Sequence, residues 1–98
     1  MTNGQKRQRA KRRKLNNVVE VLFIVLPRYL TIWDHKHPTT KILVSSSGGG
    51  YGKGEIARIA LYNKNHWVIT IDGNVTHYRK PDAVIKYLRG MELIGALG

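Results

Sequence analysis

Residues 55–79 read EIARIALYNKNHWVITIDGNVTHYR, and this stretch decides the fold. Two apolar segments that alternate with polar residues flank the polar triplet at 63–65, and Asp72-Gly73 is a strong signal for a two-residue hairpin. The pattern predicts three antiparallel strands, over 55–62, 66–72 and 74–79. A helix should follow from residues 80–82 to Gly90, because Pro81 suits a first helical turn and glycine often ends a helix.

The register of these strands decides which side chains share a face of the sheet. If residues 63–65 form a three-residue loop, one face is strongly apolar and carries Ala57, Ile59, Leu61, Trp67, Ile69 and Ile71. The predicted helix should cover that face through Val84, Ile85, Leu88 and Met91. The opposite face is then left with basic and aromatic side chains, namely Arg58, Tyr62, His66, His77 and Arg79.

The segment upstream of residue 55 predicts a second hairpin and a short element before it. Strands are expected over 28–34 and 41–46 with a polar turn at 35–39, and the Ser- and Gly-rich residues 45–54 read as a flexible loop. Residues 18–26 fit two helical turns capped by Asn17 and ended by Pro27. Five of these nine residues are β-branched, which favours a strand instead. We favour the helix.

Positive charge is concentrated near the N-terminus. Seven of the nine residues 6–14 are basic, and they supply +7 of the formal net charge of +11: Lys6, Arg7, Arg9, Lys11, Arg12, Arg13 and Lys14. A like-charge run with almost nothing apolar to bury is typically disordered. The sequence therefore predicts two parts, a flexible basic arm at 1–15 and one small domain at 16–98. The predicted fold class is α+β, a small antiparallel sheet of hairpins packed by a C-terminal helix.

A cationic arm of this density indicates a polyanionic partner, because each neutralised phosphate releases a counterion. We expect a small accessory protein that binds DNA or RNA, or a nucleoprotein complex, with little sequence preference. The expected contacts are the seven cations of the arm, Lys53 in the glycine-rich loop, and Arg58, Tyr62, His77 and Arg79 on the sheet face. The alternative is an inhibitor from a phage or mobile element, of the anti-CRISPR kind, whose arm enters a nucleic-acid enzyme or contacts its guide RNA.

Other function classes find little support in the sequence. The segment 48–54 lacks the Ser or Thr that should follow Lys53 in a phosphate-binding loop, and His35 and His37 flank a lysine in a polar turn. No set of carboxylates suggests two-metal chemistry. We therefore expect no enzyme activity, no cofactor and no metal. The apolar run at 18–26 is too short to span a membrane. The absence of cysteine fits the cytosol or the nucleoid of a host cell.

The predicted layout has a basic arm, twisted antiparallel strands and a closing helix. It resembles that of small dimeric single-strand-binding proteins of the transcriptional-cofactor type. The resemblance is one of architecture only, since no motif carries it. It implies a homodimer, which would also enlarge the modest core that about 84 residues can bury.

Overall fold

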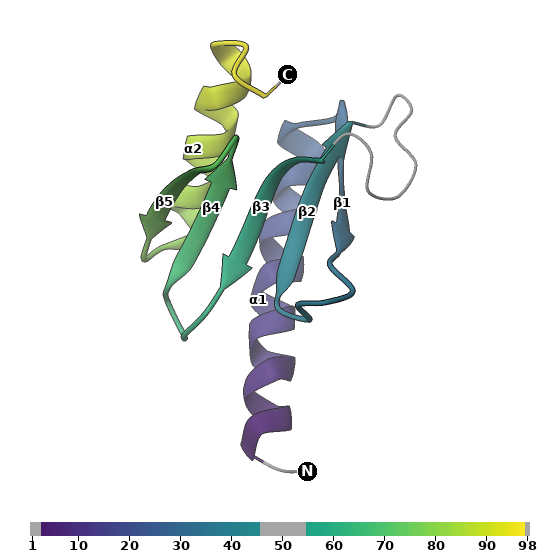
Figure 1. Ribbon diagram of the computed structural model, residues 1–98, viewed down its shortest axis with the longest axis vertical. Helices are drawn as coiled ribbons and strands as arrows, with labels where there is room; N and C mark the ends of the chain where they lie inside the picture. Colours follow the sequence, from purple (N-terminus) through teal and green to yellow (C-terminus); the bar gives the residue numbers. More distant parts are fainter. Residues whose placement is uncertain (1–2, 46–54, 98) are drawn as a thin grey trace.

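The computed structural model describes residues 3–45 and 55–97, which form one antiparallel sheet and two helices (Figure 1). The α+β class and the antiparallel sheet predicted from the sequence are confirmed. The strands lie in chain order, β1-β2-β3-β4-β5. The elements are α1 (Asn3–Val25), β1 (Tyr29–Trp33), β2 (Thr40–Ser45), β3 (Glu55–Leu61), β4 (Trp67–Ile71), β5 (Asn74–Tyr78) and α2 (Pro81–Leu93).

The predicted register of β3, β4 and β5 is confirmed. Leu61 lies opposite Trp67, which in turn lies opposite Tyr78. The backbone N–H of Tyr62 donates to the carbonyl of His66 at 3.0 Å, which leaves residues 63–65 as the three-residue loop. In the β4–β5 turn both Asp72 and Gly73 have positive φ, at 50° and 78°. A turn of this kind matches the right-handed twist of the strands that it joins.

The first hairpin is confirmed as well, and the sheet is larger than the sequence analysis expects. Strand β2 pairs with β3 as well as with β1, so the two hairpins form a single sheet of five strands. The predicted glycine-rich connection lies almost wholly outside the described residues. The pairing of β2 with β3 puts Lys41 opposite Ile59, on the face that packs against the helices. The polar turn predicted at 35–39 is also confirmed, within a connection that runs from residue 34 to residue 39.

Helix α1 confirms the helical interpretation of residues 18–26, but it starts much earlier than the proposed cap at Asn17. The expected helix start is therefore wrong. Lys, Arg, Gln and Ala in residues 5–14 are good helix formers, so the helix can continue through them once its apolar stripe is anchored. The structure describes residues 3–15 as the first half of this helix. The disorder expected for the segment 1–15 in isolation stays a prediction.

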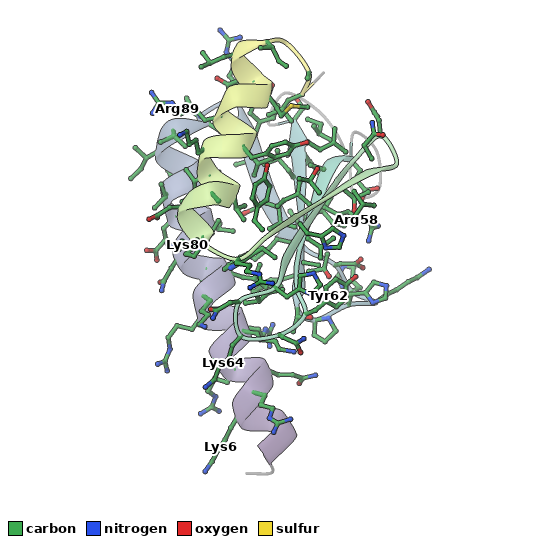
Figure 2. The ribbon with its side chains drawn as sticks, turned by 90° about the vertical axis from the view of Figure 1, so that its left-hand side faces the viewer. Lys6, Arg58, Tyr62, Lys64, Lys80 and Arg89 are labelled. Carbon is green, nitrogen blue, oxygen red and sulfur yellow. The ribbon has the colours of Figure 1, made fainter. Side chains whose placement is uncertain are left out.

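Both helices pack on the same face of the sheet, and the other face is left open (Figures 1 and 2). Helix α1 buries a stripe with helical spacing, and α2 adds a shorter one. The fully buried side chains on these helices are Leu15, Val18, Leu22, Val84 and Leu88. Because Leu15 belongs to this core, α1 links the core to the basic segment without a break. The N-terminal end of α1 extends beyond the sheet (Figure 1).

The end of α2 differs from the sequence expectation. Gly90 lies inside the helix, which continues to Leu93. Gly95, with φ 74°, follows the last turn, and its N–H donates to the carbonyl of Glu92 at 2.9 Å. The N–H of Ala96 donates to the carbonyl of Met91 at 2.8 Å. These two bonds are the Schellman arrangement, so the second glycine ends the helix and the first one does not.

Candidate nucleic-acid interface

The seven cations predicted as the main contact surface all lie on the first half of α1, over two and a half helical turns. Among the described residues, no carboxylate forms an ion pair with any of them. The first turn of α1 also contains no acidic residue. Like charges three or four residues apart and positive charge near a helix N-terminus both destabilise a helix. This half of α1 therefore carries a positive field that an anion would relieve.

The cations point to different sides of α1. Arg7, Lys11 and Lys14 face the β3–β4 loop and, with Asn63 and Lys64, line a groove of about 460 Å³. The ammonium of Lys14 donates to the carbonyl of Lys64 at 2.8 Å, which fixes the loop against the helix.

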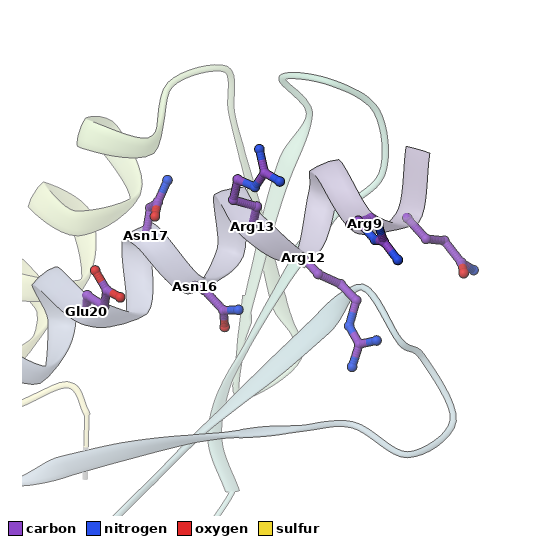
Figure 3. Close-up of a pocket in the computed structure, with 7 residues that line it drawn as sticks. Arg9, Arg12, Arg13, Asn16, Asn17 and Glu20 are labelled. Carbon is purple, nitrogen blue, oxygen red and sulfur yellow. The ribbon is translucent and has the colours of Figure 1, made fainter. Parts of the chain in front are cut away.

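The remaining cations of α1 lie away from this groove. Arg12 and Arg13 leave the helix in opposite directions (Figure 3), and both belong to a shallow polar surface with Gln8, Arg9, Asn16, Asn17 and Glu20. The structure therefore brings three of the seven predicted cations to the β3–β4 loop.

The β3–β4 loop connects the helix groove to the open side of the sheet. A second and larger depression, of about 1010 Å³, lies on its other side. Lys64 borders both depressions, and Lys80 borders the second (Figure 2 labels both residues). The predicted contacts His77 and Arg79 line this second depression. The two surfaces predicted separately, the basic segment and the sheet face, thus meet at residues 63–65.

Aromatic side chains form a row on the open face beside this depression. The ring of Tyr62 lies 5.8 Å from that of His66, and the ring of His66 stacks on His77 at 5.1 Å. The two imidazoles approach at 2.8 Å between Nε2 of His66 and Nδ1 of His77. Tyr62 is 58% exposed and points away from the helices (Figure 2). Exposed rings on a sheet offer flat surfaces for unpaired bases.

Arg58 is placed on the open face as expected, but its charge is already engaged. Its guanidinium contacts the carboxylates of both Asp34 and Glu55, each at 2.5 Å. The bond with Asp34 is the main cause that raises the pKa of Arg58. Two acids around one arginine cancel most of its attraction for a phosphate. Lys53, the remaining predicted contact, lies outside the described residues.

Sequence reasoning missed three residues of this surface: His66, Lys64 and Lys80. The predicted register places His66 on the open face, where its ring stacks on that of His77, yet His66 is not among the predicted contacts. Lys64 sits at the tip of the predicted loop, and Lys80 immediately precedes Pro81 at the start of α2. A lysine at a turn does not by itself predict a binding site. The folded sheet, with the start of α2 beside the β3–β4 loop, brings these residues together in one depression.

The described residues show neither a metal cluster nor a membrane span. In residues 3–45 and 55–97, no three His, Asp or Glu side chains gather as metal ligands would. Within the same ranges no helix has the length and apolar character needed to cross a bilayer. No protein-family model, curated protein or solved structure matches the chain.

Proposed function

We propose that this protein binds nucleic acid through the cationic half of α1 and the adjoining open face of the sheet. The observation that carries the proposal is the set of seven cations on one helix, none of them paired with a carboxylate among the described residues. A phosphate backbone is the polyanion that such a helix fits. Counterion release makes the attraction strong and independent of base sequence. The protein would act in the cytosol or nucleoid of a host cell, as a binding protein without catalysis.

The arrangement around residues 63–65 supports a two-part contact. A backbone that follows the groove at Arg7, Lys11 and Lys14 reaches Lys64 next, and then the row of rings that starts at Tyr62. Cations along the path would hold phosphates, and the rings would stack on bases that are not paired. This order of groups favours single-stranded DNA or RNA over a duplex.

The test is a salt series of binding to labelled single-stranded DNA, duplex DNA and RNA. The wild-type chain should bind all three with an affinity that falls steeply with salt. The double substitution Arg7→Gln/Lys11→Gln should reduce the slope of log K against log salt by about 0.7 per lost contact on a single strand. Glutamine keeps the helix propensity and most of the side-chain stem, so the fold is preserved.

A matched control removes two charges elsewhere. Lys86 and Arg89 are both exposed on α2, and Arg89 lies far from the cationic end of α1 in Figure 2. The variant Lys86→Gln/Arg89→Gln should keep the wild-type slope. Equal slopes for the two double variants would exclude the α1 groove as the contact. Weak binding of the wild-type chain to all three ligands at physiological salt would reject the proposal.

A second candidate, docking on a protein, is favoured by one observation. Phe23 and Ile24, adjacent on α1, are 68% and 76% exposed, and large apolar neighbours left in water often mark a protein contact. Here the chain would be the anti-CRISPR-like inhibitor, holding a nucleic-acid enzyme by this apolar pair while the cations enter its guide-RNA or DNA channel. Inhibition of an RNA-guided nuclease that Phe23→Gln abolishes, together with weak binding to free nucleic acid, would establish this function.

A further inference from the structure

Lys41 occupies an unusual place for a lysine. It lies on the helix-covered face of β2, between Trp33 on one neighbouring strand and Ile59 on the other, and is only 6% exposed. Its ammonium sits 3.8 Å from the centroid of the Trp33 ring. Buried lysines are nearly always paired with a carboxylate. Among the described residues, none pairs with Lys41.

A second cation reaches the same ring from the helix. The guanidinium carbon of Arg12 lies 4.7 Å from the Trp33 centroid. Attraction between a cation and an indole ring offsets part of the cost of burial, but it does not remove the repulsion between two positive groups. Burial, and secondarily Arg12, lowers the pKa of Lys41. The buried Lys41 and the exposed Arg12 thus share one indole ring, and the described residues provide no carboxylate that pairs with either of them.

We propose that Arg12 and Lys41, positioned by Trp33, form a binding site for one phosphoryl oxyanion. The arginine fork can donate two parallel hydrogen bonds to such a group, and the ammonium adds a charge-assisted donor from the sheet side. Arg12 is exposed, so the anion can enter from its side. Gln8 and Asn16 lie one helical turn before and after Arg12 and belong to the same polar surface. Figure 3 shows Asn16 on the same side of α1 as Arg12.

The occupant follows from the proposed function, on which this part of the inference rests. A phosphate of the nucleic-acid backbone would bind at Trp33 on one side of α1 while other phosphates follow the groove at Lys11 and Lys14 on another side. Free inorganic phosphate has the same chemistry. This site is partly buried, unlike the other cations of α1. Salt therefore screens the attraction between the site and its anion less strongly.

The experiment follows the indole N–H signal of Trp33 by NMR in the full chain. Inorganic phosphate is titrated against sodium chloride of equal ionic strength, and single-stranded oligonucleotides with and without a 5′-phosphate form two further arms. The variants are Lys41→Met, which keeps the length of the side chain, and Arg12→Gln, which changes an exposed side chain. Lys86→Met on α2 is the matched control.

We expect phosphate to shift the Trp33 signal saturably beyond the chloride control, with an affinity reduced at least tenfold in Lys41→Met and in Arg12→Gln. Lys86→Met should behave as wild type. A shift with both oligonucleotides assigns the site to the backbone, and one that needs the 5′-phosphate assigns it to a terminal or free phosphate. No shift beyond chloride, or an equal shift in wild type and Lys41→Met, overturns the inference.

The same samples separate this inference from the proposed function. If Lys41→Met binds the oligonucleotide with unchanged affinity and Trp33 never responds, the anion site is rejected and nucleic-acid binding through α1 stands. If phosphate shifts Trp33 but no oligonucleotide binds at physiological salt, the proposed function is rejected and the anion site stands. Lys41→Met should also be at least as heat-stable as wild type without phosphate, since it removes a buried charge that lacks an acid.

Discussion

Tyr62 is the side chain on the open face that is best placed to touch a base. It is exposed, it lies between the end of β3 and the 63–65 loop, and its ring begins the row formed with His66 and His77. The hydroxyl-bearing ring can stack on a base of any identity, which fits binding without sequence preference. A duplex, whose bases are already stacked, would gain little from it.

We therefore expect Tyr62→Ala to weaken binding of single-stranded DNA by about 1–3 kcal/mol and to affect duplex binding much less. Val75→Ala, which truncates another exposed side chain on the same face, is the control and should leave both affinities unchanged. Fluorescence anisotropy with both ligands at one salt concentration measures the difference. Equal losses for single strand and duplex would argue against stacking.

Asp34 is the carboxylate whose contacts most clearly stabilise the fold. It accepts a hydrogen bond from the backbone N–H of Lys36 at 2.9 Å and a second one from Arg58. The bond from Lys36 is the largest cause that lowers the pKa of Asp34 below its usual value of 3.8, while burial opposes the shift. A lowered pKa stabilises the folded state at a pH above the usual value. That stability is lost as the pH falls through the lower, folded-state value.

Asp34→Asn should therefore lower the free energy of unfolding at neutral pH by about 1 kcal/mol. The loss is limited because Arg58 is 40% exposed and keeps Glu55 as a partner. Its stability should also depend less on pH in the acid range than that of the wild type. Urea unfolding at several pH values, followed by tryptophan fluorescence, measures both effects. Asp72→Asn removes a carboxylate from the exposed β4–β5 turn and is the control. A variant that keeps the wild-type acid dependence would show that Asp34 is not its source.

At the scale of elements, the end of α2 allows a comparison of two glycines. Gly90 lies within the helix, and a Cβ added there would meet no atom within 4 Å. Gly95 has a left-handed backbone that disfavours any other residue.

Gly90→Ala should stabilise the protein by about 0.5–1 kcal/mol, and Gly95→Ala should destabilise it by about 1 kcal/mol. Thermal unfolding of the two variants and the wild type measures whether each substitution raises or lowers the stability. The opposite pair of signs would mean that α2 ends at Gly90, as the sequence alone suggests.

The elements also show which features the sequence can predict. The register of β3, β4 and β5 was predictable because one face alternates cleanly and Asp72-Gly73 fixes the turn. The sequence of strand β2 does not alternate clearly, because Ile42 and Val44 are as apolar as Leu43. Alternation alone therefore does not place Lys41 on the covered face. The extent of α1 was not predictable either. The local cost of seven like charges argues against a helix, whereas the helix propensity of the residues between them and the burial of Leu15 against the sheet argue for it.

At the scale of the whole molecule, charge and stability are coupled through α1. The same helix carries the seven cations, none of which pairs with a carboxylate among the described residues, and the core side chains Leu15, Val18 and Leu22. A polyanion that binds the cationic half removes their mutual repulsion and so stabilises the helix on which the core depends. A ligand that binds only the folded state raises the apparent stability, by about 2.7 kcal/mol at a hundred times its dissociation constant.

We therefore expect single-stranded DNA to raise the melting temperature of the wild type by several degrees at low salt. The gain should be smaller for Arg7→Gln/Lys11→Gln, and unchanged from wild type for Lys86→Gln/Arg89→Gln. Differential scanning calorimetry with and without the oligonucleotide provides the measurement. If DNA binds but the melting temperature does not change, the charge on α1 has no effect on the stability of the core.

The continuity of α1 also bears on how long a copy of this protein survives in a cell. A basic segment is rich in cleavage sites for trypsin-like proteases, which need an unwound chain. Such a cut in the free protein, between Lys14 and Leu15, would detach the whole cationic half and leave Leu15, a core residue, as the new N-terminus. Nucleic acid bound as proposed would cover this helical segment and oppose its unwinding. Under the proposed function, binding of nucleic acid would therefore protect the chain from this cut.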